Sequence, residues 1–386
     1  MKRAFLTAYG TPSDVVELHE VADPEMKDGE LIVDILAASI NPAELLMIQG
    51  LYAEKPPLPY PLGVEAVGRV KHICKGVTGF NEGDLVLSLP THNWASSLSF
   101  KPQELIKLPN NIDVQQASQI KVNLATAYCL LNDFADLKEG DWIIQNAANS
   151  SVGHYVIQLA KAKGIKTVNI VRRGGLDEQL KALGADLVTE DYKDFEKLVG
   201  TECEKPILLA LDAVGGKATR RLADCLGSGG QVVNYGLLSG EDCRLRGNQT
   251  IFNNISLRGF WLSSMLKTMK RESILAMYDE LSQLVADGKI ITDIEAAYSL
   301  DDFEDAATNN SLSDNHSRSS RHHNHDDGYW DRAVFEAMFA VIVFGGRQSH
   351  LRMESTSYTF GDSTDESDDW NFPVKRRKPG DPMIPI

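Results

Sequence analysis

The sequence predicts an α/β fold in which a β-rich region precedes a doubly wound parallel sheet. Short apolar runs separated by Gly, Pro and Asn fill residues 2–109, which is the pattern of a small barrel or sandwich of strands. From about residue 114, strand-like runs alternate with helix-like runs. Because parallel strands need a crossover connection that is usually a helix, this alternation predicts a parallel sheet.

The β-rich region contains strand-like runs and one rigid loop. The predicted strands are 31–40, 64–73, 84–89 and 104–108. Residues 55–63 hold four prolines, and proline removes a backbone donor and fixes φ. We therefore expect a loop and no helix between residues 55 and 63.

The second region predicts helices and strands in near alternation. The predicted helices are 115–134, 151–163, 176–183 and 217–226, and the predicted strands are 142–145, 167–171, 207–213, 231–235 and 256–262. Apolar positions at helical spacing over residues 272–286 predict a further amphipathic helix. These elements are those of a doubly wound sheet with helices on its faces.

Composition excludes several classes of function. Lys and Arg number 39 against 54 Asp and Glu, and the net charge of −15 opposes binding to the phosphates of nucleic acid. No apolar run reaches the roughly 18 residues that span a bilayer. The five cysteines form no C-x-x-C pair, which fits a reducing compartment. Because residues 1–10 show no leader pattern, we expect a cytoplasmic protein.

Residues 311–386 differ in composition from the rest of the chain. They hold five of the nine histidines, ten serines, an acidic run at 362–369 and a basic cluster at 375–378. This composition predicts a low-complexity, disordered tail. We expect the histidine tract at 322–325 and the basic cluster to be solvated rather than to bind a metal or nucleic acid.

One strand–turn–helix unit carries a signal for a dinucleotide. Ser150, Ser151, Val152 and Gly153 follow the first strand of the alternating region. Small residues let backbone N–H groups approach a pyrophosphate, and the helix N-terminus adds about half a positive charge. Only Gly153 remains of the usual G-x-G-x-x-G, so a simple tight turn is the alternative interpretation.

Arg172 and Arg173 indicate which dinucleotide binds. They lie about twenty residues past Gly153, where an NAD-preferring site usually has an acidic residue. Two guanidinium groups suit a 2′-phosphate, so the sequence predicts NADPH over NADH, with a solvated strand end as the alternative.

Several segments together resemble a known family. The segments are Asn41–Glu44, Met47–Tyr52, Gly63–Gly68, Lys121–Tyr128, Gln145–Gly153, Val171–Arg173, Asp212–Gly216, Asn234–Leu238 and Leu257–Ser263. In this order, over roughly residues 1–308, they resemble the zinc-free branch of the medium-chain dehydrogenase/reductases. Within that branch, the trans-2-enoyl thioester reductases, which act on enoyl-CoA or enoyl-[acyl-carrier-protein], are the most similar.

The resemblance implies domains and partners. It implies a GroES-like catalytic domain that starts at 1–115 and returns, incomplete, at 263–310, around a Rossmann domain at 116–262. It also implies reduction of enoyl thioesters in fatty acid metabolism, a homodimer, an acyl carrier protein as a further partner, and a mitochondrial location as the alternative to the cytoplasm.

The resemblance also implies site residues. Tyr52 matches the catalytic tyrosine. The residues that match NADPH contacts are Asn123, Ser150, Ser151, Val152, Gly153, Arg172, Arg173, Tyr235, Gly236, Leu237, Leu238, Phe260, Trp261, Leu262 and Ser263. Ordinary packing is the alternative for Phe260 and Trp261, which we expect at a strand end, and helix capping or packing is the alternative for Asn123.

Residue types argue against zinc. A catalytic zinc needs three nitrogen, sulfur or carboxylate ligands, and a structural zinc commonly uses four closely spaced thiolates. The Gly-His-Glu of zinc-dependent relatives is Gly63-Val64-Glu65 here, and valine cannot coordinate. Asn41-Pro42 resembles the position of the first cysteine ligand. With no cysteine quartet in the chain, the sequence predicts no metal site.

Without a metal, the reaction needs a donor for a developing enolate. Hydride addition at Cβ of an enoyl thioester moves negative charge to the thioester oxygen, and a neutral phenol can stabilise that oxygen or protonate Cα. Tyr52 is the predicted donor, and a tyrosine packed against Pro56 and Pro57 is the alternative.

Two other functions remain open from sequence. They are an NADPH:quinone or enone reductase of the same superfamily, and a non-catalytic NADPH-binding protein. The second arises because the family's closing strand and its lysine have no match after Phe303–Asn309. Ala340–Phe344 is a candidate substitute strand.

Overall fold

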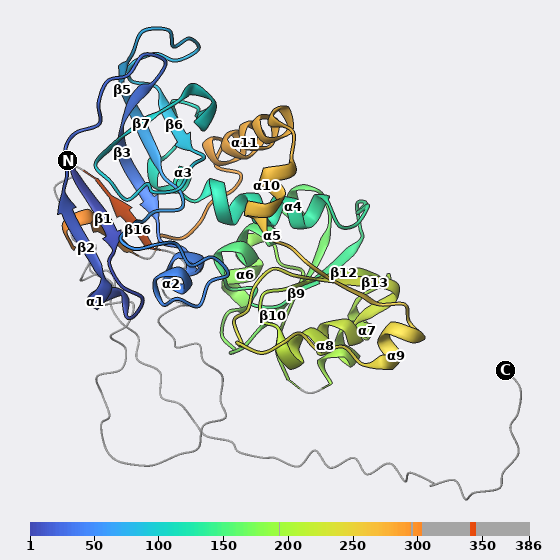
Figure 1. Cartoon of the computed structure of the whole chain (residues 1–386). Helices are drawn as coiled ribbons and strands as arrows, with labels where there is room; N and C mark the ends of the chain where they lie inside the picture. The colour runs from blue at the N-terminus through green and yellow to red at the C-terminus, as the bar shows by residue number, and fades with distance from the viewer. Residues whose placement is uncertain (193, 295, 303–339, 345–386) are drawn as a thin grey trace, which may run out of the picture. The chain divides into compact units, whose positions relative to one another are not determined.

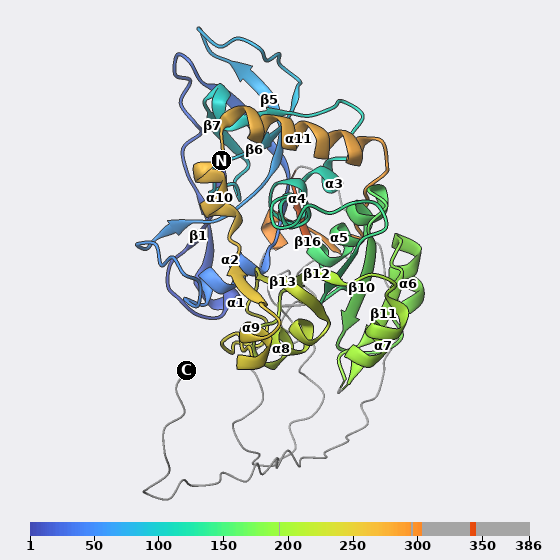
Figure 2. The same cartoon turned by 90° about the vertical axis from the view of Figure 1, so that its right-hand side faces the viewer.

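The computed structural model describes residues 1–192, 194–294, 296–302 and 340–344, all within one unit, Met1–Gly346 (Figures 1 and 2). Two sheet systems divide these residues. We call residues 1–115, 296–302 and 340–344 the antiparallel region, and residues 116–262 the parallel region. Apart from residues 340–344, the predicted tail, with its histidine tract at 322–325 and its basic cluster at 375–378, lies outside the described residues.

The antiparallel region is built from two sheets. Its elements are β1 (Lys2–Leu6), α1 (Pro12–Val15), β2 (Val16–Glu20), β3 (Leu31–Ser39), α2 (Pro42–Ile48), β4 (Tyr60–Pro61), β5 (Val67–Ile73), β6 (Leu85–Ser88), β7 (Ser97–Phe100), a 3-10 turn (Pro102–Glu104), β8 (Leu105–Lys107), β15 (Ala296–Ser299), a 3-10 turn (Leu300–Asp302) and β16 (Ala340–Val343). The small sheet has the order β2-β1-β4. The large sheet has the order β15-β16-β3-β5-β6-β8, with β7 also paired to β3.

Strand β16 lies inside the segment that composition predicts to be a disordered tail. It pairs antiparallel with β3 and parallel with β15, and Ile342 is fully buried in the core of the antiparallel region. The tail prediction is therefore wrong for residues 340–343. The candidate substitute strand is present there, because an apolar run can pair with the edge that β3 presents.

The parallel region is a six-stranded sheet with the order β11-β10-β9-β12-β13-β14. Its elements are α3 (Val114–Ala117), a π-helical turn (Ile120–Leu124), α4 (Ala125–Asn132), β9 (Trp142–Gln145), α5 (Ser151–Ala162), β10 (Lys166–Val171), α6 (Asp177–Leu183), β11 (Leu187–Glu190), α7 (Phe195–Glu202), β12 (Ile207–Asp212), α8 (Gly216–Asp224), β13 (Leu226–Asn234), α9 (Gly247–Ile251) and β14 (Ser256–Gly259). Numbered along the chain, the strands have the 3-2-1-4-5-6 order of a dinucleotide-binding sheet.

Helices cover both faces of this sheet. Adjacent residues of β9 point to opposite faces, so Ile143 packs in the cluster with α4, α5 and α11 (Arg271–Ala286). Ile144 packs in the cluster with α7 and α8. Helix α11 also packs on α3, α4 and β8, and α10 (Leu262–Thr268) precedes it (Figure 2). Within the described residues, no helix is long and apolar enough to cross a membrane.

Two predicted elements differ from the structure. The predicted helix 115–134 is broken by the π-helical turn, where the Val122 N–H donates to a Glu65 carboxylate oxygen (3.0 Å). The predicted strand 256–262 ends at Gly259, because the Phe260 N–H makes the last ladder bond and Trp261 starts a helix. The sequence pattern also missed β11 and α7.

Candidate functional site

All the predicted cofactor residues except Asn123 follow strands of the parallel sheet at one of its edges. Strands β9, β10, β12, β13 and β14 are parallel, so their carboxyl ends share this edge. The predicted residues follow those ends: 150–153 after β9, 172–173 after β10, 235–238 after β13 and 260–263 after β14. Ligands of open α/β sheets bind at this edge, where the strand order reverses.

Asp212 organises the reversal point between β9 and β12. Its buried carboxylate accepts hydrogen bonds from the Asn146 amide (2.6 Å), the Thr219 hydroxyl (2.6 Å) and the N–H groups of Val214 and Gly215 (3.0 Å each). These bonds satisfy a charge that is costly to bury unpaired. These bonds hold the loop that follows β9 against the loop that follows β12.

Two glycines bring backbone close to this edge. A Cβ on Gly153 would lie 2.5 Å from the Ala148 carbonyl oxygen, and one on Gly236 would lie 2.6 Å from the Ala213 carbonyl oxygen. Neither position can hold a larger residue without a shift of backbone. The Ser150 hydroxyl caps α5 by accepting from the Gly153 N–H (3.2 Å). The two glycines therefore allow close packing of the chain on itself, and they leave the N-terminus of α5 at the edge of the sheet.

The other predicted cofactor residues differ in exposure. Arg172 and Arg173 are exposed just past β10. Burial raises the pKa of Tyr235 above its ordinary value, and Asp212 adds to the rise. Leu237 is 56% exposed. Because Arg172 and Arg173 are exposed, their guanidinium groups are accessible to a phosphate that approaches from the solvent. Leu238 is partly buried, and its N–H donates to the Ala213 carbonyl oxygen (3.1 Å).

Tyr52 and Trp261 meet although 209 residues separate them. The Trp261 indole N–H donates to the Tyr52 hydroxyl oxygen (2.9 Å), and the rings are edge to face with centroids 6.3 Å apart. The Tyr52 N–H donates to the Leu46 carbonyl oxygen of α2. Because the phenol oxygen accepts from Trp261, its own O–H remains available to a ligand. Burial raises the pKa of Tyr52, so the phenol stays protonated at neutral pH.

Phe260 and Trp261 point to different partners. The Phe260 ring packs edge to face on Phe134 and adds to the core, whereas Trp261 is 39% exposed beside Tyr52. Leu262 is buried at the start of α10, and Ser263 is exposed. Phe260 therefore packs against the core, whereas Trp261 contacts Tyr52.

A buried polar cluster lies behind the site. It consists of six buried side chains: Ser39, Asn41, Glu44, Glu65, Lys121 and Asn123. Asn123 reaches across to Asn41, which joins the π-helical turn to the antiparallel region (3.1 Å between Asn123 Nδ2 and Asn41 Oδ1). Burial raises the pKa of Glu44 to about 8 and lowers that of Lys121 to about 8, and it also raises the pKa of Glu65.

Sequence reasoning assigned no role to most of this cluster. Glu44 accepts from the Asn41 N–H (2.9 Å), as the third residue of a capped helix does. The Asn-Pro-x-Glu spacing of residues 41–44 was the available signal for that bond. No pattern along the chain could place Lys121 on the carbonyl oxygens of Val64 and Pro90.

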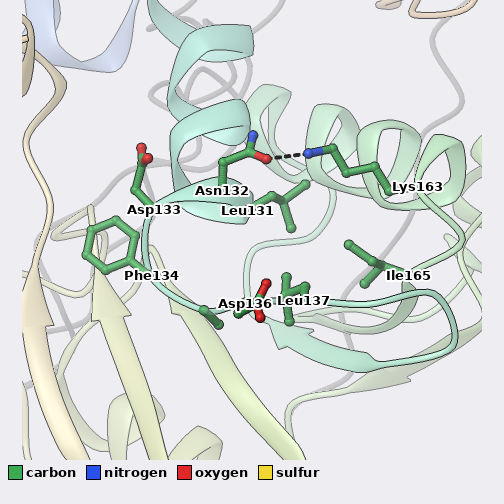
Figure 3. Close-up of a pocket in the computed structure, with 9 residues that line it drawn as sticks. Leu131, Asn132, Asp133, Phe134, Asp136, Leu137, Lys163 and Ile165 are labelled. Carbon is green, nitrogen blue, oxygen red and sulfur yellow. Dashed lines mark hydrogen bonds between the residues drawn. The ribbon is translucent and has the colours of Figure 1, made fainter.

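A pocket of about 400 Å³ has Phe134, the packing partner of Phe260, among its lining residues (Figure 3). It is formed by the end of α4, the following loop and the end of α5, and Lys163 bonds to Asn132 at its rim. Since it precedes β9 and β10 in the chain, it lies at the amino edge of the sheet. None of the predicted site residues lines it.

Comparison with known proteins assigns the family. The alcohol dehydrogenase GroES-like domain model matches residues 27–103, and the zinc-binding dehydrogenase model matches residues 151–281. The mitochondrial enoyl-[acyl-carrier-protein] reductase of Dictyostelium discoideum is 40% identical over 292 residues, covering 72% of this chain and 83% of that protein. The chain belongs to the enoyl-[acyl-carrier-protein] reductase family. The protein of the same name from Homo sapiens is 35% identical, covering 77% of this chain and 82% of that protein.

Solved structures of an enoyl thioester reductase and of a quinone oxidoreductase share this fold. The 2-enoyl thioester reductase heterodimer Etr1p/Etr2p of Candida tropicalis is 27% identical with a TM-score of 0.74, covering 80% of this chain and 97% of that one. The Escherichia coli quinone oxidoreductase in complex with NADPH is 26% identical with a TM-score of 0.71, covering 80% of this chain and 95% of that one. The predicted fold, a GroES-like part with a Rossmann part, is confirmed.

The description of the second family model names zinc, whereas the sequence predicts no metal. Among residues 1–192, 194–294, 296–302 and 340–344, no group of three or more His, Cys, Asp or Glu is arranged to hold a metal ion. That the site of this chain works without a metal ion stays a prediction.

Proposed function

We propose that this chain reduces the 2,3 double bond of trans-2-enoyl thioesters with NADPH. The observation that carries the proposal is the Tyr52 hydroxyl, held by Trp261 beside the edge where a dinucleotide-binding sheet takes its ligand. Family membership supports the same activity. The predicted domain limits, 1–115, 116–262 and 263–310, are part of the proposal.

The residues at the sheet edge fit NADPH. The N-terminus of α5 would bind the pyrophosphate, and Arg172 with Arg173 would bind the 2′-phosphate. When bound, NADPH supplies the hydride that adds to Cβ. Tyr52 then donates to the thioester oxygen, where negative charge develops, or gives its proton to Cα.

The test compares substrates with NADPH present. We expect crotonyl-CoA to be reduced with a kcat/KM at least about tenfold above that of a benzoquinone, because the phenol is placed for an enolate. Loss of NADPH absorbance measures both reactions. A quinone preference would favour the quinone or enone reductase, and NADPH binding without turnover of either would favour the non-catalytic alternative.

We further propose an acyl carrier protein as a partner. Lys267 is exposed, lies 3.8 Å from Glu54 and is over the Trp261 ring, and Lys270, three residues later, is also exposed. This cationic pair would attract an acidic carrier despite the net charge of −15. Lys267→Glu with Lys270→Glu should raise the KM for a crotonyl carrier protein and leave that for neutral crotonyl-pantetheine unchanged.

A homodimer is proposed through the β14 edge of the parallel sheet. All four residues of β14 are exposed, and Ile251 and Phe252 beside it are 73% and 79% exposed. An unpaired strand edge with apolar neighbours favours pairing with a second copy. Leu257→Pro should convert a dimer into a monomer in light scattering, whereas a monomeric unmodified chain would contradict the proposal.

The compartment is also a proposal. The relatives in Dictyostelium, Homo and Xenopus are named mitochondrial, whereas the sequence predicts a cytoplasmic protein. The five cysteines are free thiols, which fits either reducing compartment. Fractionation of cells that carry the tagged full chain distinguishes the two.

A further inference from the structure

The buried polar cluster fixes the direction in which its hydrogen bonds run. We propose that Glu65 and Asn41 are positioning residues, which orient the Asn123 amide so that its carbonyl oxygen is the atom offered to the dinucleotide. The identity of that ligand rests on the proposed function. The orientation itself rests on the contacts of the described residues alone.

Glu65 is the first member of a series of hydrogen bonds that runs through Asn41 to Asn123. All of its own contacts in this series come from donors. Its Oε1 accepts from the Ser39 hydroxyl and from Asn41 Nδ2 (3.0 Å), and its Oε2 accepts from the Val122 N–H (3.0 Å). A carboxylate can accept all three, and the buried Lys121 ammonium compensates its charge. The group at position 65 therefore accepts from the Asn41 amide nitrogen and the Val122 N–H, neither of which can accept in turn.

Asn41 transmits this polarity. Its Nδ2 contacts three oxygens, those of Ser39 (2.9 Å), Glu65 (3.0 Å) and Glu44 (3.3 Å). Since only the amide nitrogen can donate, the Asn41 carbonyl oxygen must face the other way. That oxygen accepts from Asn123 Nδ2 at 3.1 Å.

Asn123 presents the end of the chain of bonds. Its Nδ2 is used by Asn41, and among the described residues no donor contacts its Oδ1. The side chain is 7% exposed, at the junction between the two regions. An amide oxygen held in this way binds a hydrogen-bond donor, such as a carboxamide NH2 or a ribose hydroxyl. A residue placed only for packing or capping would need no such fixed polarity.

The first variant that tests this inference is Glu65→Gln. A glutamine brings an NH2 group among three donors, so one contact becomes donor against donor unless the Asn41 amide turns over. Turning over would make Asn123 offer its nitrogen instead. We expect the Kd for NADPH, measured by fluorescence titration, to rise about tenfold, the loss of roughly one hydrogen bond.

The second variant restores the polarity with the same net charge. In Asn41→Asp with Glu65→Gln, the new amide at position 65 donates to the new carboxylate at position 41, whose other oxygen still accepts from Asn123. Glu44, whose pKa burial raises to about 8, can carry the proton that its contact with this carboxylate needs. We expect the Kd for NADPH to return to within about threefold of the unmodified chain.

Asp84→Asn is the matched control. Asp84 is a largely buried carboxylate of the same region that accepts from Lys107 and the Asn81 N–H, neither of which belongs to the cluster. It should lower the melting temperature without changing the Kd. An unchanged Kd in Glu65→Gln, or a double variant no better than the single one, overturns the inference. Failure of the unmodified chain to reduce crotonyl-CoA while these Kd differences persist would instead overturn the proposed function.

Discussion

The parallel and antiparallel regions supply the site in different ways. The parallel region offers backbone and exposed side chains in loops that follow strands, as at Gly153, Gly236 and Arg172. The antiparallel region offers ionisable groups that are buried, as at Glu44 and Glu65. Ligand binding in the parallel region depends on the backbone conformation of these loops. The charge and hydrogen-bond direction of the buried groups in the antiparallel region depend on their hydrogen-bond partners. Loss of a partner should therefore matter more in the antiparallel region.

The largest expected effect tests whether β16 belongs to the antiparallel region. Ile342→Ala removes a fully buried side chain between β3 and β15, which should lower the free energy of unfolding by about 3 kcal/mol. Urea denaturation measures the change. Met26→Ala, 64% exposed in a loop of the same region, is the control and should change it by less than about 0.5 kcal/mol. Equal effects would mean that β16 adds nothing to the core.

The next effect tests the catalytic group of the antiparallel region. Tyr52→Phe removes the hydroxyl and leaves the ring against Trp261, so kcat for crotonyl-CoA should fall on the order of 100-fold while the fold is kept. Steady-state kinetics with NADPH in excess measures this fall. The Kd for NADPH should stay unchanged, and unchanged turnover would remove Tyr52 from the chemistry.

The sequence predicted the parallel region well for a physical reason. Most of its strands and helices are continuous runs of local pattern, and β9 was predicted at its observed limits, Trp142–Gln145, although β11 and α7 were missed. The residues after each strand reach one edge because parallel strands share a direction. The pattern failed where a distant group intervened, as Glu65 does at Val122 in the π-helical turn.

The antiparallel region was less predictable because its contacts are distant in sequence. Tyr52 and Trp261 could be singled out, yet their hydrogen bond joins segments 209 residues apart. Strand β16 comes from a segment whose composition is that of a tail, and it pairs with the distant strands β3 and β15. The buried cluster depends on tertiary contacts of the same kind, at Lys121 above all.

A smaller effect tests the cofactor side of the parallel region. Arg172→Ala with Arg173→Ala removes two cations that suit a 2′-phosphate, so the KM for NADPH should rise about 30-fold. The KM for NADH should change by less than about threefold, because NADH lacks that phosphate and serves as the internal control. Equal changes for both dinucleotides would refute the assignment.

The smallest effect tests the bond that joins the two regions. Trp261→Phe keeps an aromatic ring but removes the N–H that donates to Tyr52, so kcat should fall about fivefold, as for one neutral hydrogen bond. The Trp261 bond lowers the pKa of Tyr52, against the rise caused by burial. Its loss should raise that pKa further and move the alkaline limb of the kcat profile to higher pH.

The background of Tyr52→Phe decides whether Trp261 acts through the phenol. There, Trp261→Phe should change kcat by less than about 1.5-fold, because the bond that it removes is already absent. An undiminished fivefold effect in that background would assign Trp261 to the wall of the substrate or cofactor site instead. Because the indole comes from the end of β14 and the phenol from beyond α2, the double-mutant coupling measures directly how strongly one region positions the reactive group of the other.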